Sequence, residues 1–286
     1  MTEGTPFALT TPAFVDHVDL VVGDLPRMSS FYQHVVGLSV LEEEPGRAVL
    51  GVSGRPLLTL TERRDATPAP KTAAGLFHIA FLVPSRADLA HWLAHAAELN
   101  LRLEGASDHL VSEALYLSDP EGNGIEIYRD RQPEDWDYHD DGMVEMATER
   151  LDLKDLLSEA PERPFTGMAA GTAIGHIHLQ VGDVAEAEGF YRDILGMTVM
   201  AHYPGASFMA TGGYHHHVAA NVWNSRRAEP RHGAMRGLSG YRLHYNDAAK
   251  LEATLAALGQ SQIPVRQTAS GFAISDPWNI GITLST

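Results

Sequence analysis

The stretch His17–Val40, "HVDLVVGDLPRMSSFYQHVVGLSV", decides the fold because the chain repeats it as "HIHLQVGDVAEAEGFYRDILGMTV" from His176 to Val199. The offset between the two copies is constant at 159 residues (176 − 17). The residues shared at this offset include Val22, Gly23, Asp24, Phe31, Tyr32, Gly37 and Val40, which recur as Val181, Gly182, Asp183, Phe190, Tyr191, Gly196 and Val199. A constant offset over this many positions indicates an internal duplication.

Each copy has the pattern of one small folding unit. An alternating strand is followed by a turn of sequence VGD, a short amphipathic helix with a Phe-Tyr pair, and a glycine at which the helix must end. Short strands then follow in each copy: "RAVLGV" (47–52) and "PLLTLT" (56–61) in the first, "ASFMAT" (206–211) and "VAANVW" (218–223) in the second. The unit is therefore a strand, a helix and a run of strands.

A fainter pair of units follows the same plan. Residues 75–98, "GLFHIAFLVPSRADLAHWLAHAAE", predict a strand and then a helix capped by Ser85, with Asp88 three residues later. Residues 237–259, "GLSGYRLHYNDAAKLEATLAALG", repeat this plan with Gly240 in the place of His78. Each of these units ends in a hairpin that contains Ser-Asp-Pro, at 118–120 and at 275–277.

The four units predict an α+β fold of four βαβββ modules, paired into two open-barrel domains. We place the N-terminal domain at residues 1–130, with units one and two, and the C-terminal domain at residues 172–286, with units three and four. The acidic, proline-bearing segment 131–171 between them is predicted to be an ordered linker with a short helix in "LDLKDLLSEA" (151–160). Its acidic residues are expected to face solvent.

The bulk composition excludes several classes of function. The formal net charge of −16 over 286 residues makes a nucleic-acid backbone or an anionic membrane a poor partner. No apolar run approaches the roughly 18 residues that span a bilayer, and residues 1–14 lack the plan of a signal peptide, so we expect a cytoplasmic protein. The chain has no cysteine, so any metal must be bound by nitrogen and oxygen, for which its 15 histidines offer candidates.

The clearest candidate for chemistry is an acid inside a predicted strand. Glu126 lies in "LYLSDPEGNGIEIYRD" (115–130), whereas its counterpart near the end of the chain is Thr283. A buried carboxylate is costly unless it is paired or binds a metal. His17 and His78 each lie in the first strand of their unit, so pairing of units one and two would bring two imidazoles and one carboxylate together. Such a set leaves about half of an octahedron open for substrate.

The repeat, the Gly-His strand starts and the ending "DPEGNGIEIY" (119–128) resemble the vicinal oxygen chelate superfamily, which includes glyoxalase I, fosfomycin-resistance enzymes, bleomycin-binding proteins and extradiol dioxygenases. Four segments are more narrowly similar to two-domain bacterial proteins of the catechol-2,3-dioxygenase-like type: "GLFHIAFLVPSRADL" (75–89), "SDHLVSEALYLSDPEGNGIEIYRDR" (107–131), "IGHIHLQVGD" (174–183) and "GGYHHHVAANVW" (212–223). The resemblance implies metal ligation by His17, His78 and Glu126. It also implies that Tyr116 hydrogen-bonds the substrate and that His109, a candidate acid/base, lines the same pocket.

The sequence departs from this family at one strand. Extradiol dioxygenases carry a histidine pair in the last strand of the first unit of the active half, where one histidine acts as an acid/base, but here "RPLLTLT" (55–61) has none. The chain has its histidine run in the other half, where His215 and His217 are expected on one face of a strand and His216 on the other. Glyoxalase I takes a fourth ligand, a glutamate, from that same strand, where this chain offers only Thr59 or Glu62.

The leading hypothesis is a metal-dependent dioxygenase-like enzyme that acts on a small catechol or another substrate with vicinal oxygens. The ligand set favours Fe(II) or Mn(II). Zn(II) or Ni(II) would suit an isomerase or transferase of the glyoxalase or fosfomycin-resistance kind, and a protein that only binds a flat aromatic ligand would carry no metal. His176 lacks a second histidine and an acid at the matching places of its half and is expected to be structural. The expected partner is a small-molecule substrate, and assembly into a homo-oligomer is left open.

Overall fold

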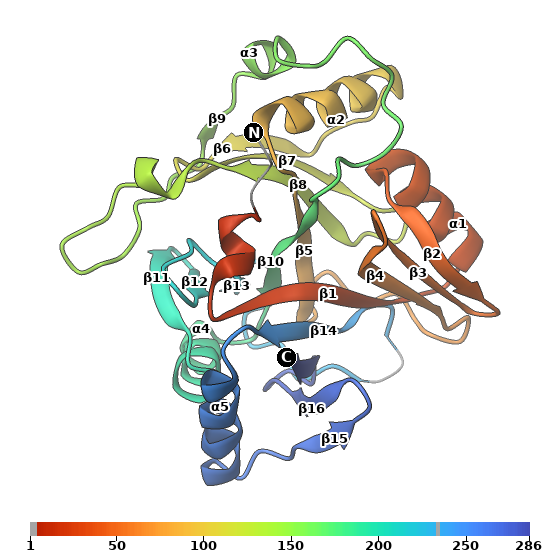
Figure 1. Ribbon diagram of the computed structural model, residues 1–286. Coiled ribbons are helices and arrows are strands. Elements are labelled where there is room, and N and C mark those ends of the chain that lie inside the picture. Colours follow the sequence, from red (N-terminus) through yellow and green to blue (C-terminus); the bar gives the residue numbers. More distant parts are fainter. Residues whose placement is uncertain (1–4, 233–234) are drawn as a thin grey trace.

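Four modules of the predicted order follow one another along the chain (Figure 1). They are seen in a computed structural model that describes residues 5–232 and 235–286, so the first four residues of the predicted N-terminal domain lie outside the described ranges. The first module follows the 3-10 helix η1 (Phe7–Thr10) and contains β1 (Ala13–Val22), α1 (Leu25–Phe31), the π-helical turn η2 (Tyr32–Val36), β2 (Ser39–Glu44), β3 (Arg47–Val52) and β4 (Arg55–Glu62). The second contains β5 (Gly75–Leu82), α2 (Arg86–Glu98), β6 (Gly105–Asp108), β7 (Ser112–Ser118) and β8 (Gly124–Asp130).

The second half of the chain repeats this order. The linker between the halves contains η3 (Pro133–Asp135), β9 (Glu149–Arg150) and α3 (Leu153–Leu157). The third module contains β10 (Ala173–Gln180), α4 (Val184–Glu188), the π-helical turn η4 (Gly189–Ile194), β11 (Thr198–Tyr203), β12 (Ala206–Ala210) and β13 (Val218–Asn221). The fourth contains β14 (Gly237–Tyr245), α5 (Ala248–Gln260), β15 (Arg266–Thr268), β16 (Gly271–Ser275) and β17 (Gly281–Ser285). Among the described residues no helix is long and apolar enough to cross a membrane.

The modules pair across the two halves of the chain. An eight-stranded sheet has the order β15-β16-β17-β14-β1-β4-β3-β2, and a nine-stranded sheet has the order β11-β12-β13-β10-β5-β8-β7-β6-β9. Module one therefore joins module four through β1 and β14, and module two joins module three through β5 and β10, both pairs being antiparallel. The expectation that modules one and two share a sheet is thus not what the strands show. The pattern of the first strands could not decide this, because β1 and β10 are copies of the same strand.

The local sequence accounts for the helix starts. Asp24 and its copy Asp183 cap α1 and α4, each accepting a hydrogen bond from a backbone N–H three residues later at 3.0 Å. Ser85 caps α2 as predicted, because its Oγ accepts a hydrogen bond from the backbone N–H of Asp88 at 3.1 Å. Gly37 ends the first helical segment with a φ of 96°, a left-handed conformation that favours glycine.

Two tyrosine-aspartate hydrogen bonds connect the sheets. The hydroxyl of Tyr32 in module one donates to Asp119 in module two at 3.0 Å, and its copy Tyr191 in module three donates to Asp276 in module four at 3.4 Å. Both aspartates belong to the Ser-Asp-Pro hairpins. Each hydrogen bond joins two modules of the same half, whereas the strand pairs join modules of opposite halves. A continuous apolar core that includes strands of both sheets lies between these connections.

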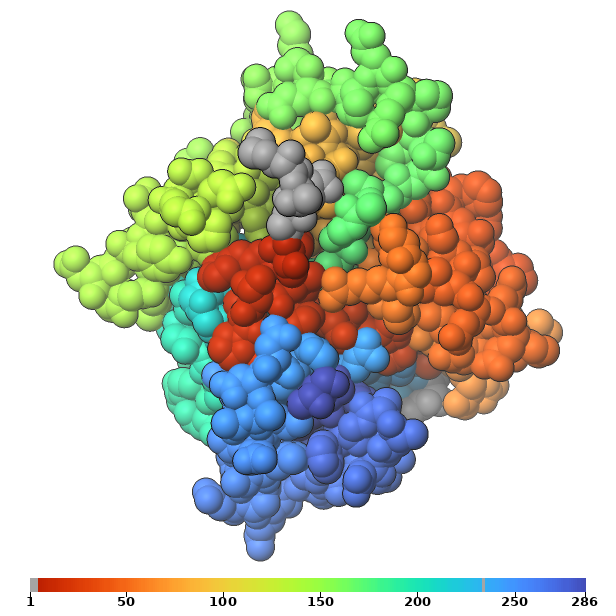
Figure 2. Space-filling model, viewed as in Figure 1, coloured from red at the N-terminus to blue at the C-terminus, as the bar shows by residue number. Residues whose placement is uncertain are grey.

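The linker packs along the amino-terminal half, as Figure 2 shows for its yellow-green and green atoms. The predicted short helix is present as α3, and it lies beside α2. Trp136 and Leu156 are buried, and Arg86 of α2 forms ion pairs with Asp155 and Glu159. The acidic residues of the linker are therefore partly engaged in ion pairs with the amino-terminal half.

We predict that Asp276 makes the fold less stable as the pH rises. Burial raises the pKa of its carboxyl from 3.8 to about 7, although the backbone N–H groups of Ile280 and Trp278 donate to it. The unfolded chain releases this proton near pH 4 and the folded chain near pH 7. The free energy of unfolding should therefore fall between these values, by up to roughly 4 kcal/mol. Urea denaturation followed by circular dichroism at pH 5 and pH 8 measures this loss.

The Asp276→Asn variant should lose this pH dependence, because a carboxamide does not titrate. Asp193→Asn is the matched control, because Asp193 is exposed and its pKa is lowered by Arg192. Equal pH dependence in the wild type and in Asp276→Asn would contradict the prediction.

Candidate metal centre

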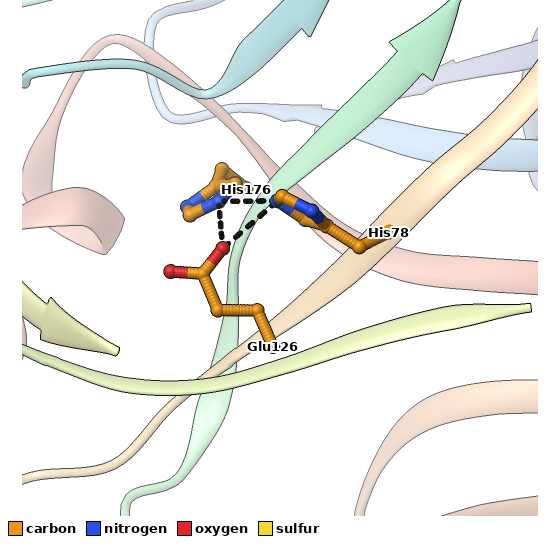
Figure 3. A group of neighbouring side chains, drawn as sticks. All are labelled: His78, Glu126 and His176. Atoms are coloured by element: carbon orange, nitrogen blue, oxygen red, sulfur yellow. Dashed lines mark hydrogen bonds and ion pairs between the residues drawn. The ribbon is translucent and has the colours of Figure 1, made fainter. Parts of the chain in front are cut away.

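Three side chains converge on one point of the nine-stranded sheet: His78 of β5, Glu126 of β8 and His176 of β10 (Figure 3). Glu126 Oε2 lies 2.8 Å from His78 Nε2 and 3.1 Å from His176 Nε2, and the two Nε2 atoms are 3.3 Å apart. All three residues are buried, with Glu126 only 2% exposed. Within residues 5–232 and 235–286, this is the group of three such ligands whose donor atoms lie within 4.8 Å of one another.

The strand register explains the convergence. Ala80 of β5 lies opposite His176 of β10 on one side and beside Glu126 of β8 on the other. His78 is two residues before Ala80 and therefore points to the same face of the sheet. The residues that alternate with them along the strands, such as Ile79 of β5 and Ile125 of β8, point into the apolar core. The small side chain of Ala80 leaves the space between the three ligands open.

Two glycines permit this close arrangement. β10 has a register shift between Ile174 and His176, which re-aims the histidine as β-bulges commonly do. A Cβ on Gly175, the intervening residue, would lie 1.7 Å from the hydroxyl of Tyr128. A Cβ on Gly124 of β8 would lie 2.0 Å from the backbone oxygen of Phe77, so only glycine lets β8 approach β5 at His78.

The electrostatics of the group favour the protonation states that a metal requires. Burial lowers the pKa of His176 to about 4, so its imidazole is neutral near pH 7. Burial acts to raise the pKa of Glu126, but the imidazoles of His176 and His78 outweigh it and hold that pKa well below the usual value. Metal ligation needs an unprotonated imidazole nitrogen and an ionised carboxylate. Two nitrogen donors and one oxygen donor at one point fit a divalent cation.

His17 lies elsewhere, which corrects the predicted ligand set. It belongs to β1 of the eight-stranded sheet, where its Nε2 is 2.8 Å from Thr59 Oγ1 and 3.5 Å from Asp19 Oδ1. The strand registers show that Gly240 and Thr283 hold the places in this sheet that His78 and Glu126 hold in the other. His176, which was expected to be structural, lies at the position where the sequence argument had placed His17.

Tyr116 and His109 lie at the same site, as expected. Tyr116 is opposite Glu126 in the β7 to β8 ladder, and its hydroxyl is 2.7 Å from His109 Nε2. His109 Nδ1 is 2.7 Å from the backbone oxygen of Ala147, which can only accept. His109 Nδ1 therefore carries a proton, which it donates to that backbone oxygen. Ala147 belongs to the linker, so the linker forms part of the pocket.

One residue of the histidine run, His216, also lies at this site. His215, His216 and His217 are all buried and come just before β13, so the expected alternation of His215 and His217 on one strand face is not observed. β13 pairs with β10 in the nine-stranded sheet, and the ring centroid of His216 is 4.0 Å from that of His176. Cross-half pairing thus brings His216 to the candidate metal ligands. Extradiol dioxygenases carry such histidines at the active site. The position of the run in module three therefore indicated that module three pairs with module two, which supplies His78 and Glu126.

A cavity of about 630 Å³ opens onto the three ligands. Tyr116, His109 and His216 line it, as does His178, which the sequence analysis did not select and whose Nε2 accepts a hydrogen bond from Asn221 at 3.0 Å. Aromatic side chains form part of its wall: Phe77, Phe208 and Trp223. This volume suits a small-molecule ligand, for which pockets of about 300–1,000 Å³ are typical.

Comparison with known proteins gives the following similarities. The sequence model of the Glyoxalase/Bleomycin resistance protein/Dioxygenase superfamily matches residues 14–127 and 173–282. The chain is 38% identical over 267 residues to the catechol-2,3-dioxygenase of Bacillus subtilis (strain 168), which covers 92% of this chain and 93% of that protein. It is 29% identical over 131 residues to the biphenyl-2,3-diol 1,2-dioxygenase 3 of Rhodococcus globerulus, covering 43% of this chain and 66% of that one.

The fold has counterparts among solved structures. Glyoxalase I from Zea mays superposes with a TM-score of 0.56 at 15% sequence identity, covering 97% of this chain and 94% of the other. At this identity the likeness concerns the fold alone.

The two repeat-related histidines make a matched test of the metal centre. We predict that His176→Ala weakens Mn(II) or Zn(II) binding by at least about 100-fold, because it removes one of three ligands. His17→Ala, 159 residues earlier in the repeat, should leave the dissociation constant within about twofold. Isothermal titration of chelator-treated protein measures both. A loss in His17→Ala as large as that in His176→Ala would contradict the assignment.

Proposed function

The chain belongs to the Glyoxalase/Bleomycin resistance protein/Dioxygenase superfamily, and from this premise we propose that it cleaves a small catechol beside its paired hydroxyls, with Fe(II) as the metal. It is an extradiol-dioxygenase-like oxidoreductase. The observation that carries the proposal is the convergence of His78, Glu126 and His176 at one end of the cavity. Catechol and dioxygen would combine without loss of atoms: one ring carbon-carbon bond breaks, and its two carbons become an aldehyde and a carboxylic acid.

The ligand set supports Fe(II). Two histidines and one carboxylate on one face are typical of non-haem Fe(II) oxygenases, and Mn(II) accepts the same ligands. When bound, the metal would hold the two adjacent oxygens of the catechol and offset the negative charge they gain as they lose protons. The protein's part is to keep His176 neutral and Glu126 ionised and to hold His78 beside them.

Residues around the ligands are placed to accept a proton from a catechol and to hydrogen-bond its hydroxyls. His216 lines the cavity beside His176, and burial lowers its pKa, so it is a neutral imidazole that could accept a proton from a substrate hydroxyl. The hydroxyl of Tyr116 forms hydrogen bonds with His109 and Glu126 and lines the cavity, so it is placed to bond a substrate hydroxyl beside the ligands. The aromatic side chains of Phe77 and Trp223 offer surfaces against which a planar ring can pack.

The glyoxalase alternative finds less support in the same site. Glyoxalase I takes a fourth ligand, a glutamate, from the strand that corresponds to β13. Here that strand reads Val218, Ala219, Ala220 and Asn221, without an acid. Thr59 and Glu62, which the sequence analysis considered for this role, lie in β4 of the other sheet.

Oxygen consumption tests the proposal directly. Protein purified anaerobically and loaded with Fe(II) should consume about one dioxygen per catechol, as measured with an oxygen electrode over a panel of substituted catechols. The His78→Ala variant should show no uptake above the protein-free rate, because it lacks a ligand. Metal binding without catechol-dependent uptake in the wild type would overturn the proposal and favour an isomerase or transferase.

Removal of one hydroxyl tests the role of Tyr116. We predict that Tyr116→Phe lowers kcat/KM for catechol by about 10- to 100-fold, the usual effect of losing a hydrogen bond to a charged group. Tyr138→Phe is the control, because Tyr138 is exposed and lies in the linker. Equal kcat/KM for both variants and the wild type would remove Tyr116 from the substrate site.

A further inference from the structure

A row of three hydrogen-bonded side chains leads away from the cavity behind His216. His216 Nδ1 is 2.7 Å from His215 Nδ1, and His215 Nε2 is 2.8 Å from Asp130 Oδ1. His215 is fully buried, and Asp130 lies at the end of β8, four residues after Glu126. None of these contacts is needed to hold the three metal ligands, so they require a separate explanation.

For a neutral His215, the acceptor at the end of the row sets the direction of every hydrogen bond. An ionised carboxylate can only accept, so His215 Nε2 carries a proton and donates it to Asp130. A neutral His215 then has a bare Nδ1, which can only accept. The proton between the two Nδ1 atoms must therefore belong to His216. A neutral His216 with its proton on Nδ1 leaves Nε2 bare.

The surroundings of Asp130 are arranged to keep it an acceptor. The hydroxyl of Tyr214 donates to both carboxylate oxygens of Asp130, at 2.9 and 3.2 Å. Tyr128 in turn donates to Tyr214 at 2.8 Å, because the Tyr214 proton is already directed at Asp130. Trp136 of the linker packs beside His215 with ring centroids 5.3 Å apart and helps to cover the row. Asp130 thus accepts hydrogen bonds from two buried donors, Tyr214 and His215.

We propose that Asp130 and His215 are positioning residues that fix the tautomer of His216, so that its bare Nε2 is available to accept a proton from the bound substrate. The part that concerns the substrate rests on the proposed function, whereas the tautomer itself does not. Nε2 is the ring nitrogen of His216 for which the described residues provide no hydrogen bond. The aspartate of a serine protease triad sets a histidine tautomer in the same way, although there the contact is direct.

The opposite arrangement is chemically distinct and can be detected. If His215 were a cation paired with Asp130, both of its nitrogens would carry protons. Its Nδ1 would then donate to His216 Nδ1, and the proton of a neutral His216 would be on Nε2. In that state His216 could not accept a proton from a substrate at Nε2.

Nitrogen NMR of the full chain separates the two states. The protein is labelled with ¹⁵N in its histidines and loaded with Zn(II) in place of a redox-active metal, and long-range ¹H–¹⁵N correlations report which ring nitrogen carries the proton. The signals of His216 are identified by their loss in His216→Gln. We expect a protonated Nδ1 and a bare Nε2 in the wild type. A protonated Nε2 would overturn the proposal, whether or not the protein oxidises catechols.

A variant of Asp130, at the far end of the row, tests whether this residue sets the tautomer of His216. Asp130→Asn replaces an obligatory acceptor with a group that can also donate, so a population of His216 with a protonated Nε2 should appear. For the Fe(II) protein, kcat should fall about tenfold or more while KM changes less than about threefold, because a general base is impaired without loss of binding. An unchanged tautomer in a folded Asp130→Asn protein would overturn the proposal.

Asp193→Asn is the control for this experiment, because it makes the same change in an exposed carboxylate that pairs with Arg192. The tautomer of His216 and the value of kcat should both stay close to those of the wild type. A shift of the tautomer in Asp193→Asn as large as that in Asp130→Asn would overturn the proposal. Should Asp130→Asn not fold, the wild-type tautomer alone still decides it.

Discussion

The antiparallel pairing of β5 with β10 is the contact on which the candidate site depends. Glu126 is almost fully buried, and an isolated carboxylate in such a place would cost several kcal/mol of stability. Its own module supplies one compensating imidazole, that of His78. The second comes from His176, 98 residues further along the chain (176 − 78), and reaches Glu126 only because the register sets it opposite Ala80. The candidate metal centre therefore needs side chains from both halves of the chain.

The rest of the fold holds this cross-half pairing in place. Strand pairs join modules of opposite halves, while the hydrogen bonds of Tyr32 with Asp119 and of Tyr191 with Asp276 join modules of the same half. Each module is thus connected to two others through different elements. The linker adds a further constraint, because it is packed on α2 and also supplies the backbone oxygen of Ala147 that orients His109. Catalytic geometry depends on such support, since a side chain held loosely by about 1 Å loses much of its effect.

The sequence contained most of the fold but only part of the site. A constant offset of 159 residues and the Ser-Asp-Pro hairpins were enough to predict four βαβββ modules, because periodicity and turn chemistry are local. His78 and Glu126 could be predicted because they differ from their copies, Gly240 and Thr283. The choice between His17 and His176 could not be predicted from the first strands, because both copies carry the histidine. Pairing between strands is a long-range property. The lack of a histidine pair near Thr59, and its presence at residues 215–217, was the one feature that pointed to the observed pairing.

The eight-stranded sheet lacks the surroundings that the acid has in the other sheet. Gly240 offers no side chain where the nine-stranded sheet has His78, and Arg242 holds the place of Ala80 between β1 and β17. Position 283 is also only partly buried, whereas Glu126 is almost fully buried. The partner of His17 in this sheet is the hydroxyl of Thr59, not a carboxylate of the last strand. The asymmetry between the copies thus follows the neighbours of each position: the buried acid lies between two imidazoles, and the partly buried threonine lies beside an arginine.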